Sequence, residues 1–199
     1  QFYIPDVVYL AKQYPEYAKF GGFSNMLAYG EFPLDTYGTG NCLLPGGVIM
    51  NQDVAKVAAV NLANVTEDVS RSWYAKGAAL NPASGVTSPS YTGYDQEADY
   101  SWLKAPRYQG KPMEVGPLAR VLVAYGKGQT QVKSAVDSLL STLGLTLNDM
   151  FSVLGRTAAR AIETQVIGQA MTGWLATLKS NIAAGNIATF TGKAVPANA

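Results

Sequence analysis

The amino-acid sequence predicts an α+β fold that is mainly α-helical, with two halves of different character. The N-terminal half is rich in glycine, proline and aromatic residues, which is typical of turns around short extended segments. In the C-terminal half, apolar residues recur at helical spacing between recognisable start and stop residues. We therefore expect loops, short strands and helix over residues 1–116, packed long helices over 117–186 and a tail over 187–199. All three parts are expected to belong to a single domain, 1–199.

The first expected helix lies within residues 1–20. Pro5 suits the first helical turn, and the carboxylate of Asp6 is favourable near a helix N-terminus. Pro15 then marks the end of the helix. Further along, glycine-rich turns surround short extended pieces, of which residues 48–50 are the most apolar.

A second helix is expected over residues 64–74. Asn64 precedes Glu67 by three residues, which is the spacing of a capping box. Residues 77–99 are dominated by Gly, Asn, Pro, Ser and Thr and are expected to form a loop. Residues 100–116 hold Trp102, Arg107, Tyr108 and Met113 between prolines and glycines, which predicts short strands or an extended hairpin.

Three helices are expected after residue 116. Pro117 begins the first, and Thr130 is the expected cap of the second, which Gly144 ends. Asn148 or Ser152 begins the last and longest helix. Its apolar residues step by four and are expected to share one tightly packed face: Leu154, Ala158, Ile162, Val166, Ala170, Trp174, Leu178 and Ile182.

The charge content limits the classes of partner. Only 15% of the residues are charged, against about 25% in a typical soluble domain. A chain with so little charge is expected to bury much of its surface against other protein. The formal net charge is +1, and no block of Lys or Arg indicates nucleic-acid binding. No segment reaches the ~18 apolar residues of a membrane span.

The residues that usually bind redox or hydrolytic metals are almost absent. The chain has no histidine, and Cys42 is its only cysteine. These 199 residues therefore cannot supply a zinc, nickel or non-haem iron site of the usual kind, or a triad with a histidine base. Asp95, Glu97 and Asp99 alternate in a polar stretch, which we interpret as a solvated loop rather than a cation site. No catalytic, cofactor-binding or metal-ligating residue is assigned.

Two groups of charged residues and two aromatic stretches are candidates for contacts with other parts of the chain or with a partner. On the last helix, Glu163 can pair with Arg160, and Arg156 lies one turn before Arg160. A structural ion pair that ties this helix to a neighbouring element is favoured over a contact with a partner or an anion. A second group gathers around the turns of 104–120 and is also expected to be structural: Arg107, Lys111, Glu114 and Arg120. The stretches 72–74 (SWY) and 91–94 (YTGY) fit a protein interface or a packed core equally well.

Several motifs follow one another in an order that resembles the large subunit of nickel–iron hydrogenases. The longest are 100–107 (YSWLKAPR) and 110–120 (GKPMEVGPLAR). The others are 29–33 (YGEFP), 44–49 (LPGGVI), 65–69 (VTEDV), 72–74 (SWY), 89–93 (PSYTG), 154–160 (LGRTAAR) and 188–190 (ATF). The resemblance covers nearly the whole chain and is strongest to the membrane-associated uptake type.

The resemblance implies a nickel–iron centre with diatomic ligands, held by two Cys-x-x-Cys pairs near the two ends of the complete subunit. Neither pair occurs here, so the chain is expected to be the central part of such a subunit, with the ligands outside it. Implied partners are the remainder of the large subunit, a small subunit with iron–sulfur clusters and a possible membrane cytochrome. The implied location is the periplasmic side of the cell membrane, or the cytoplasm for a divergent type.

The chain departs from the family pattern at two positions. Arg71 stands where a histidine commonly precedes Ser-Trp-Tyr, and Asn81 stands where His-Pro is common. The resemblance implies a scaffold segment of an enzyme that oxidises H2 to protons and electrons. Two alternatives stay open: a non-catalytic hydrogenase-related subunit of a redox complex, and an independent helical interaction protein.

Overall fold

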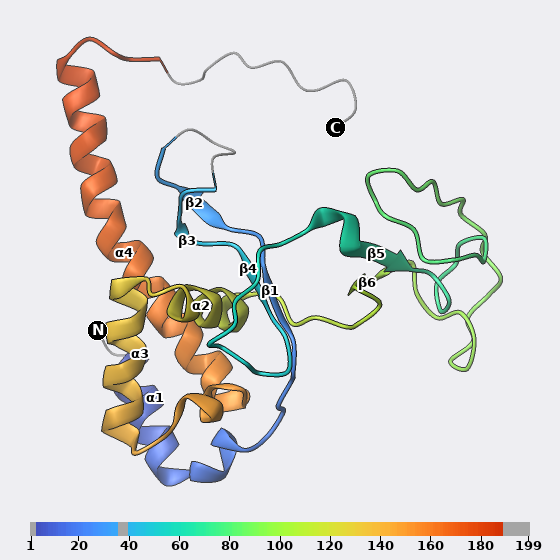
Figure 1. Cartoon of the computed structure of the whole chain (residues 1–199), viewed down its shortest axis with the longest axis horizontal. Helices are drawn as coiled ribbons and strands as arrows, with labels where there is room; N and C mark the ends of the chain where they lie inside the picture. Colours follow the sequence, from blue (N-terminus) through green and yellow to red (C-terminus); the bar gives the residue numbers. More distant parts are fainter. Residues whose placement is uncertain (1–2, 36–39, 189–199) are drawn as a thin grey trace. The chain divides into compact units, whose positions relative to one another are not determined.

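The computed structural model describes residues 3–35 and 40–188 and is mixed α+β, as expected (Figure 1). The α-helices are α1 (Tyr3–Gln13), α2 (Pro117–Gly126), α3 (Thr130–Leu143) and α4 (Val153–Ala183). The strands are β1 (Met26–Ala28), β2 (Glu31–Pro33), β3 (Cys42–Leu44), β4 (Gly47–Ile49), β5 (Val65–Asp68) and β6 (Ala105–Tyr108). Short 3₁₀ turns lie at Pro15–Ala18, Leu62–Asn64 and Leu147–Met150.

The chain divides into two compact units, residues 1–163 and 164–199. The described part of the second unit is the distal portion of α4 and the turn after it. Most of the expected tail, 187–199, lies outside the described residues, and the single-domain organisation stays a prediction. Within the described ranges, no helix combines the length and the apolar character needed to cross a membrane.

The core of the first unit is built around α2. As expected, Pro117 occupies the first turn of this helix. Leu118, Val121, Leu122 and Val123 are each at most 2% exposed, so α2 is apolar on nearly every side. A helix of this kind is stable only when it is surrounded by other elements. It contacts β1, β3, β4 and α3, which together cover it.

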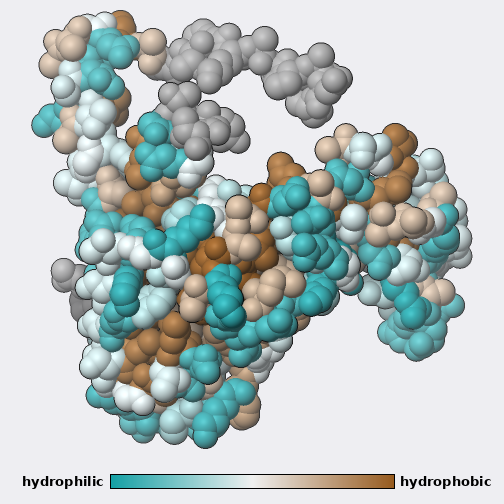
Figure 2. All heavy atoms as spheres, viewed as in Figure 1, coloured by the Kyte–Doolittle hydropathy of each residue, from teal (hydrophilic) through white to brown (hydrophobic). Residues whose placement is uncertain are grey.

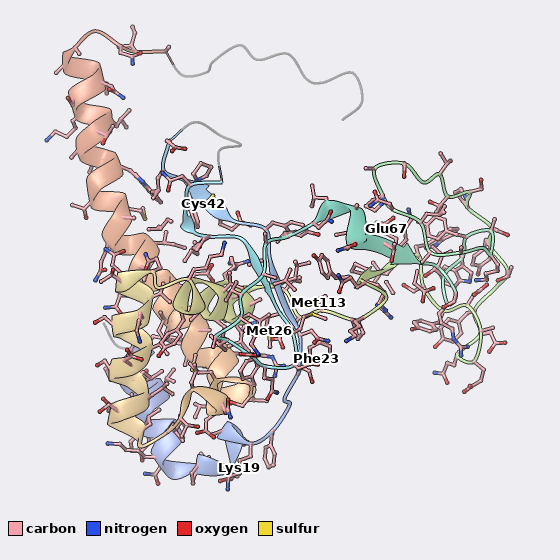
Figure 3. The ribbon with its side chains drawn as sticks, in the orientation of Figure 1. Lys19, Phe23, Met26, Cys42, Glu67 and Met113 are labelled. Atoms are coloured by element: carbon pink, nitrogen blue, oxygen red, sulfur yellow. The ribbon has the colours of Figure 1, made fainter. Side chains whose placement is uncertain are left out.

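The antiparallel pair of β1 and β4 packs against α2. Met26 lies opposite Ile49 in this pair, in agreement with the extended segment expected at 48–50. A Cβ atom added to Gly47 would lie 2.9 Å from the Val123 side chain, so the glycine allows the strand to approach the helix closely. Met113 lies near Met26 of β1 (Figure 3) and packs against the cluster that contains Leu27 and Val48. Apolar surface remains visible among polar residues over this region (Figure 2).

The prediction of a helix over residues 64–74 is wrong. Its first residues form β5, which pairs antiparallel with β6 so that Val65 lies opposite Tyr108. The Asn61 side chain, rather than Asn64, accepts the capping hydrogen bond from the Ala63 amide, at 3.0 Å. The β-branched residues at the start of β5 favour an extended backbone, and pairing with a distant strand outweighs a local capping pattern.

The helix boundaries near α3 and α4 are mostly as expected. Gly144 ends α3 with a φ of 66°, a left-handed conformation that glycine adopts at little cost. The cap of α3 differs from the prediction, because the Gln129 side chain, rather than that of Thr130, accepts from the Val132 amide. Ser152 precedes α4, and its Oγ accepts a 3.0 Å hydrogen bond from the Gly155 amide.

The single apolar face expected along α4 holds only for its first half. Leu154, Ala158 and Ile162 are buried, whereas Leu178 and Ile182 are more than half exposed. Residues four apart in an α-helix are offset by about 40° beyond a full turn. Repeated steps of four therefore drift around the helix, and the predicted row of eight residues does not lie on one face.

Candidate functional site

Two arginine–glutamate pairs tie the first part of α4 to neighbouring elements. Arg120 of α2 binds Glu163 through two hydrogen bonds, of 2.6 and 3.1 Å. Arg156 binds Glu114 through two of 2.7 Å each. All four side chains are mostly buried. The hydrogen bonds to the carboxylates raise the pKa of both arginines above its ordinary value, so each pair is a charge-assisted bidentate contact.

The predicted partner of Glu163 was wrong, although the predicted kind of interaction is confirmed. Glu163 binds Arg120, and the Arg160 guanidinium donates to the Arg156 carbonyl, at 3.0 Å. A neighbour four residues away is always available on a helix. Only the tertiary structure shows that Glu163 pairs instead with Arg120, which lies 43 positions earlier on α2.

Glu114 is the centre of a wider polar network. Its amide donates to the Asn25 carbonyl and its carbonyl accepts from the Leu27 amide, both at 2.9 Å. Asn25 is 8% exposed and donates from its side chain to the Pro112 carbonyl at 3.3 Å. One glutamate thus connects β1, the segment before α2 and, through Arg156, α4. Nothing in the local sequence around Asn25 predicted its part in this network.

An aromatic cluster is formed by Trp73, Tyr74, Tyr91 and Trp102. The ring centroids of Trp73 lie 5.1 Å from Tyr91 and 5.3 Å from Trp102. The Trp73 indole also donates to the Gly93 carbonyl, at 2.6 Å. Tyr91 is 67% exposed and Trp102 is 46% exposed. The rings therefore hold one another in place while part of the cluster faces solvent, as in many protein interfaces.

The interpretation of Asp99 as a solvated residue is wrong. Asp99 is 5% exposed, its carboxylate pairs with the Lys76 ammonium, and it accepts a 3.0 Å hydrogen bond from Thr92. The hydrogen bond from Lys76 is the main reason that the pKa of Asp99 lies below its usual value. Asp95 and Glu97 are exposed. No spacing in the sequence connects Lys76 with Asp99, so this pair was missed.

The two departures from the family pattern have structural contacts. The Arg71 guanidinium donates to the Glu97 carbonyl. The Asn81 side chain donates to the carbonyls of Leu62 and Val65, each at 2.9 Å. Both side chains therefore hold loop backbone in place.

The potential metal ligands do not converge. Among the described residues, no group of three His, Cys, Asp or Glu side chains could hold a metal ion. Cys42, a free and partly buried thiol on β3, lies far from Glu67 on β5 (Figure 3). This donor set does not fit a nickel–iron centre, which requires several thiolates. The described residues thus provide α4 braced by two arginine–glutamate pairs and a partly exposed aromatic cluster.

The chain is similar to large subunits of known hydrogenases. It is 38% identical to the uptake hydrogenase large subunit of Rhizobium leguminosarum bv. viciae, over 92% of this chain and 35% of that protein. It is 35% identical to the hydrogenase-1 large chain of Escherichia coli (strain K12), over 94% of this chain and 35% of that one. The chain thus spans about a third of the length of these relatives.

Solved structures show the same similarity. The Ni-Fe-Se hydrogenase of D. vulgaris Hildenborough in its as-isolated oxidised state matches with a TM-score of 0.72 and 32% identity, over 99% of this chain and 39% of that chain. The [NiFeSe]-hydrogenase of Dm. baculatum matches with a TM-score of 0.70 and 34% identity, over 88% and 36%. The sequence profile described as nickel-dependent hydrogenase matches residues 1–199. The 199-residue chain therefore belongs to the nickel-dependent hydrogenase family.

Proposed function

We propose that these residues are the central scaffold of a nickel–iron hydrogenase large subunit. The complete enzyme oxidises H2 to protons and electrons, and a small iron–sulfur subunit receives the electrons. The observation that carries this proposal is the family match over all 199 residues, together with the likeness to solved hydrogenases.

The nickel–iron centre of this proposal lies outside the 199 residues. A single cysteine and no histidine do not provide its ligands, so no chemical step is assigned to this chain. Its own contribution is mechanical. The Arg120–Glu163 and Arg156–Glu114 pairs fix α4 against α2 and the segment before it. These contacts hold the helices in the positions that the metal-bearing parts of the subunit require.

The proposed partners are the remainder of the large subunit and the small iron–sulfur subunit, with a membrane cytochrome as a further candidate. The low charge content and the partly exposed aromatic cluster support extensive protein contacts. We place the complete enzyme on the periplasmic side of the cell membrane, held there by its partners. A cytoplasmic location is the alternative for a divergent member.

The test is H2-dependent dye reduction and nickel content, measured on the purified enzyme with Glu114→Gln. We expect fewer nickel-loaded molecules and an unchanged rate per nickel, because a scaffold residue affects assembly rather than chemistry. Asp137→Asn is the control, because it removes an exposed pair with Lys133 and should change neither quantity. Full nickel loading with a lower rate per nickel would refute the scaffold role. Absence of any H2 oxidation by the loaded wild type would refute the enzyme assignment.

A further inference from the structure

A β-turn with two left-handed residues follows β4. The Asp53 amide donates to the Met50 carbonyl at 3.1 Å and closes the turn. The central residues, Asn51 and Gln52, have φ values of 54° and 62°. Two central residues with positive φ are the mark of a type I′ turn, which favours glycine, asparagine or aspartate at these positions. Gln52 therefore holds a backbone conformation that is strained for a residue with a long side chain.

The segment before β1 holds this turn in place. The side-chain oxygen of Asn25 accepts a 3.1 Å hydrogen bond from the Asn51 amide. The Ser24 carbonyl accepts from the Gln52 amide at 2.8 Å, and the Phe23 carbonyl accepts from the Gln52 side chain at 3.2 Å. A strained backbone persists only where its surroundings determine it in this way.

Asn25 also binds the segment that precedes α2. Its side-chain nitrogen donates to the Pro112 carbonyl at 3.3 Å, and its backbone carbonyl accepts from the Glu114 amide at 2.9 Å. Glu114 in turn binds Arg156 of α4. Asn25 is 8% exposed, so loss of either side-chain hydrogen bond leaves a group that water does not readily satisfy. One buried side chain thus contacts both the strained turn and the segment tied to α4.

We propose that Asn25 is a conformational latch, which holds the turn at 50–53 in its strained form and makes that form depend on the Glu114–Arg156 pair. Loss of the pair frees the segment that positions Asn25, and the turn then loses its acceptor for the Asn51 amide and relaxes. Strained residues of this kind gather at switch segments, where release of the strain favours the change. All of these contacts lie within the first compact unit, so the inference does not require H2 oxidation.

The test is hydrogen exchange of the Asp53 amide, measured on the intact polypeptide that contains these 199 residues. Asn25→Ala should accelerate this exchange about 30-fold, which corresponds to the loss of a buried hydrogen bond. Adding Gln52→Gly should slow the exchange again by about 5-fold, because glycine adopts a φ of 62° at little cost. Without strain at this position, the added glycine would only loosen the turn further. Faster exchange in the double variant would therefore overturn the proposal.

Glu114→Gln tests the dependence of the turn on α4. It weakens the pair with Arg156 and should accelerate exchange of the Asp53 amide about 5-fold. Glu163→Gln is the matched control, because it weakens the other mostly buried arginine pair of α4 and should leave this amide unchanged. Equal effects of the two substitutions, or no effect of Glu114→Gln, would overturn the coupling. This comparison decides the question even if Asn25→Ala does not fold.

Discussion

Replacing Gly155 by alanine should destabilise the chain, although alanine is normally the better helix former. A Cβ atom at this position would lie 1.9 Å from the carbonyl oxygen of Met150 and 2.5 Å from its carbonyl carbon. These are backbone atoms, so no side-chain rotation relieves the contact. Overpacking costs about 1–3 kcal/mol, and replacing a helical glycine by alanine returns about 1 kcal/mol. Because the contact is so short, we expect a net loss of about 2 kcal/mol.

The assay is urea unfolding of the 199-residue chain, followed by far-UV circular dichroism. With a slope of about 2 kcal/mol per molar urea, Gly155→Ala should lower the midpoint by about 1 M. Gly173→Ala is the matched control in the same helix, because no atom lies within 4 Å of its added Cβ. It should stabilise α4 by about 0.5–1 kcal/mol. A midpoint for Gly155→Ala at or above that of the wild type would refute the packing argument.

Three further expectations concern charge and backbone conformation. Glu163→Gln should lower the free energy of unfolding by about 2–3 kcal/mol in the same assay. This value lies between those of exposed and buried ion pairs, because Arg120 keeps part of its solvent contact. An unchanged urea midpoint would contradict this expectation. The pKa of Asp99 is lowered by Lys76. The ionised Asp99 carboxylate therefore contributes its full stabilisation of the folded chain above the ordinary pKa of an aspartate, and this contribution disappears as the pH falls through the lowered value. Tryptophan fluorescence should report that acid transition, and Asp99→Asn should abolish it. Gly144→Ala should cost about 1 kcal/mol by urea unfolding, because alanine tolerates the φ of 66° poorly; no loss would count against a strained position.

Local signals explain which elements could be predicted. Pro117, Ser152 and Gly144 act within one helical turn of their own position, so the starts of α2 and α4 and the end of α3 followed from the sequence. The predicted helix at 64–74 failed because its capping pattern competed with pairing to a strand about 40 residues later. The apolar row along α4 failed for a geometric reason, since steps of four do not match the helical period.

The polar contacts were decided by the tertiary structure. Lys76 reaches Asp99, and Arg120 reaches Glu163, across separations for which the sequence offers no periodic signal. Even the 14 acidic and 15 basic residues of this chain allow a large number of possible pairings. Only the packing of helices and loops brings particular partners within hydrogen-bonding distance.

The sequence by itself determined the family, the mixed α+β class and the absence of histidine and of paired cysteines, because these depend on which residues are present and in what order. The tertiary structure decided how the glutamates brace α4, that Asp99 is buried, and that the apolar residues of α4 are buried only in its first half. These features depend on the direction in which side chains point and on what lies beside them. Residue order alone does not specify such directions between elements that are distant along the chain.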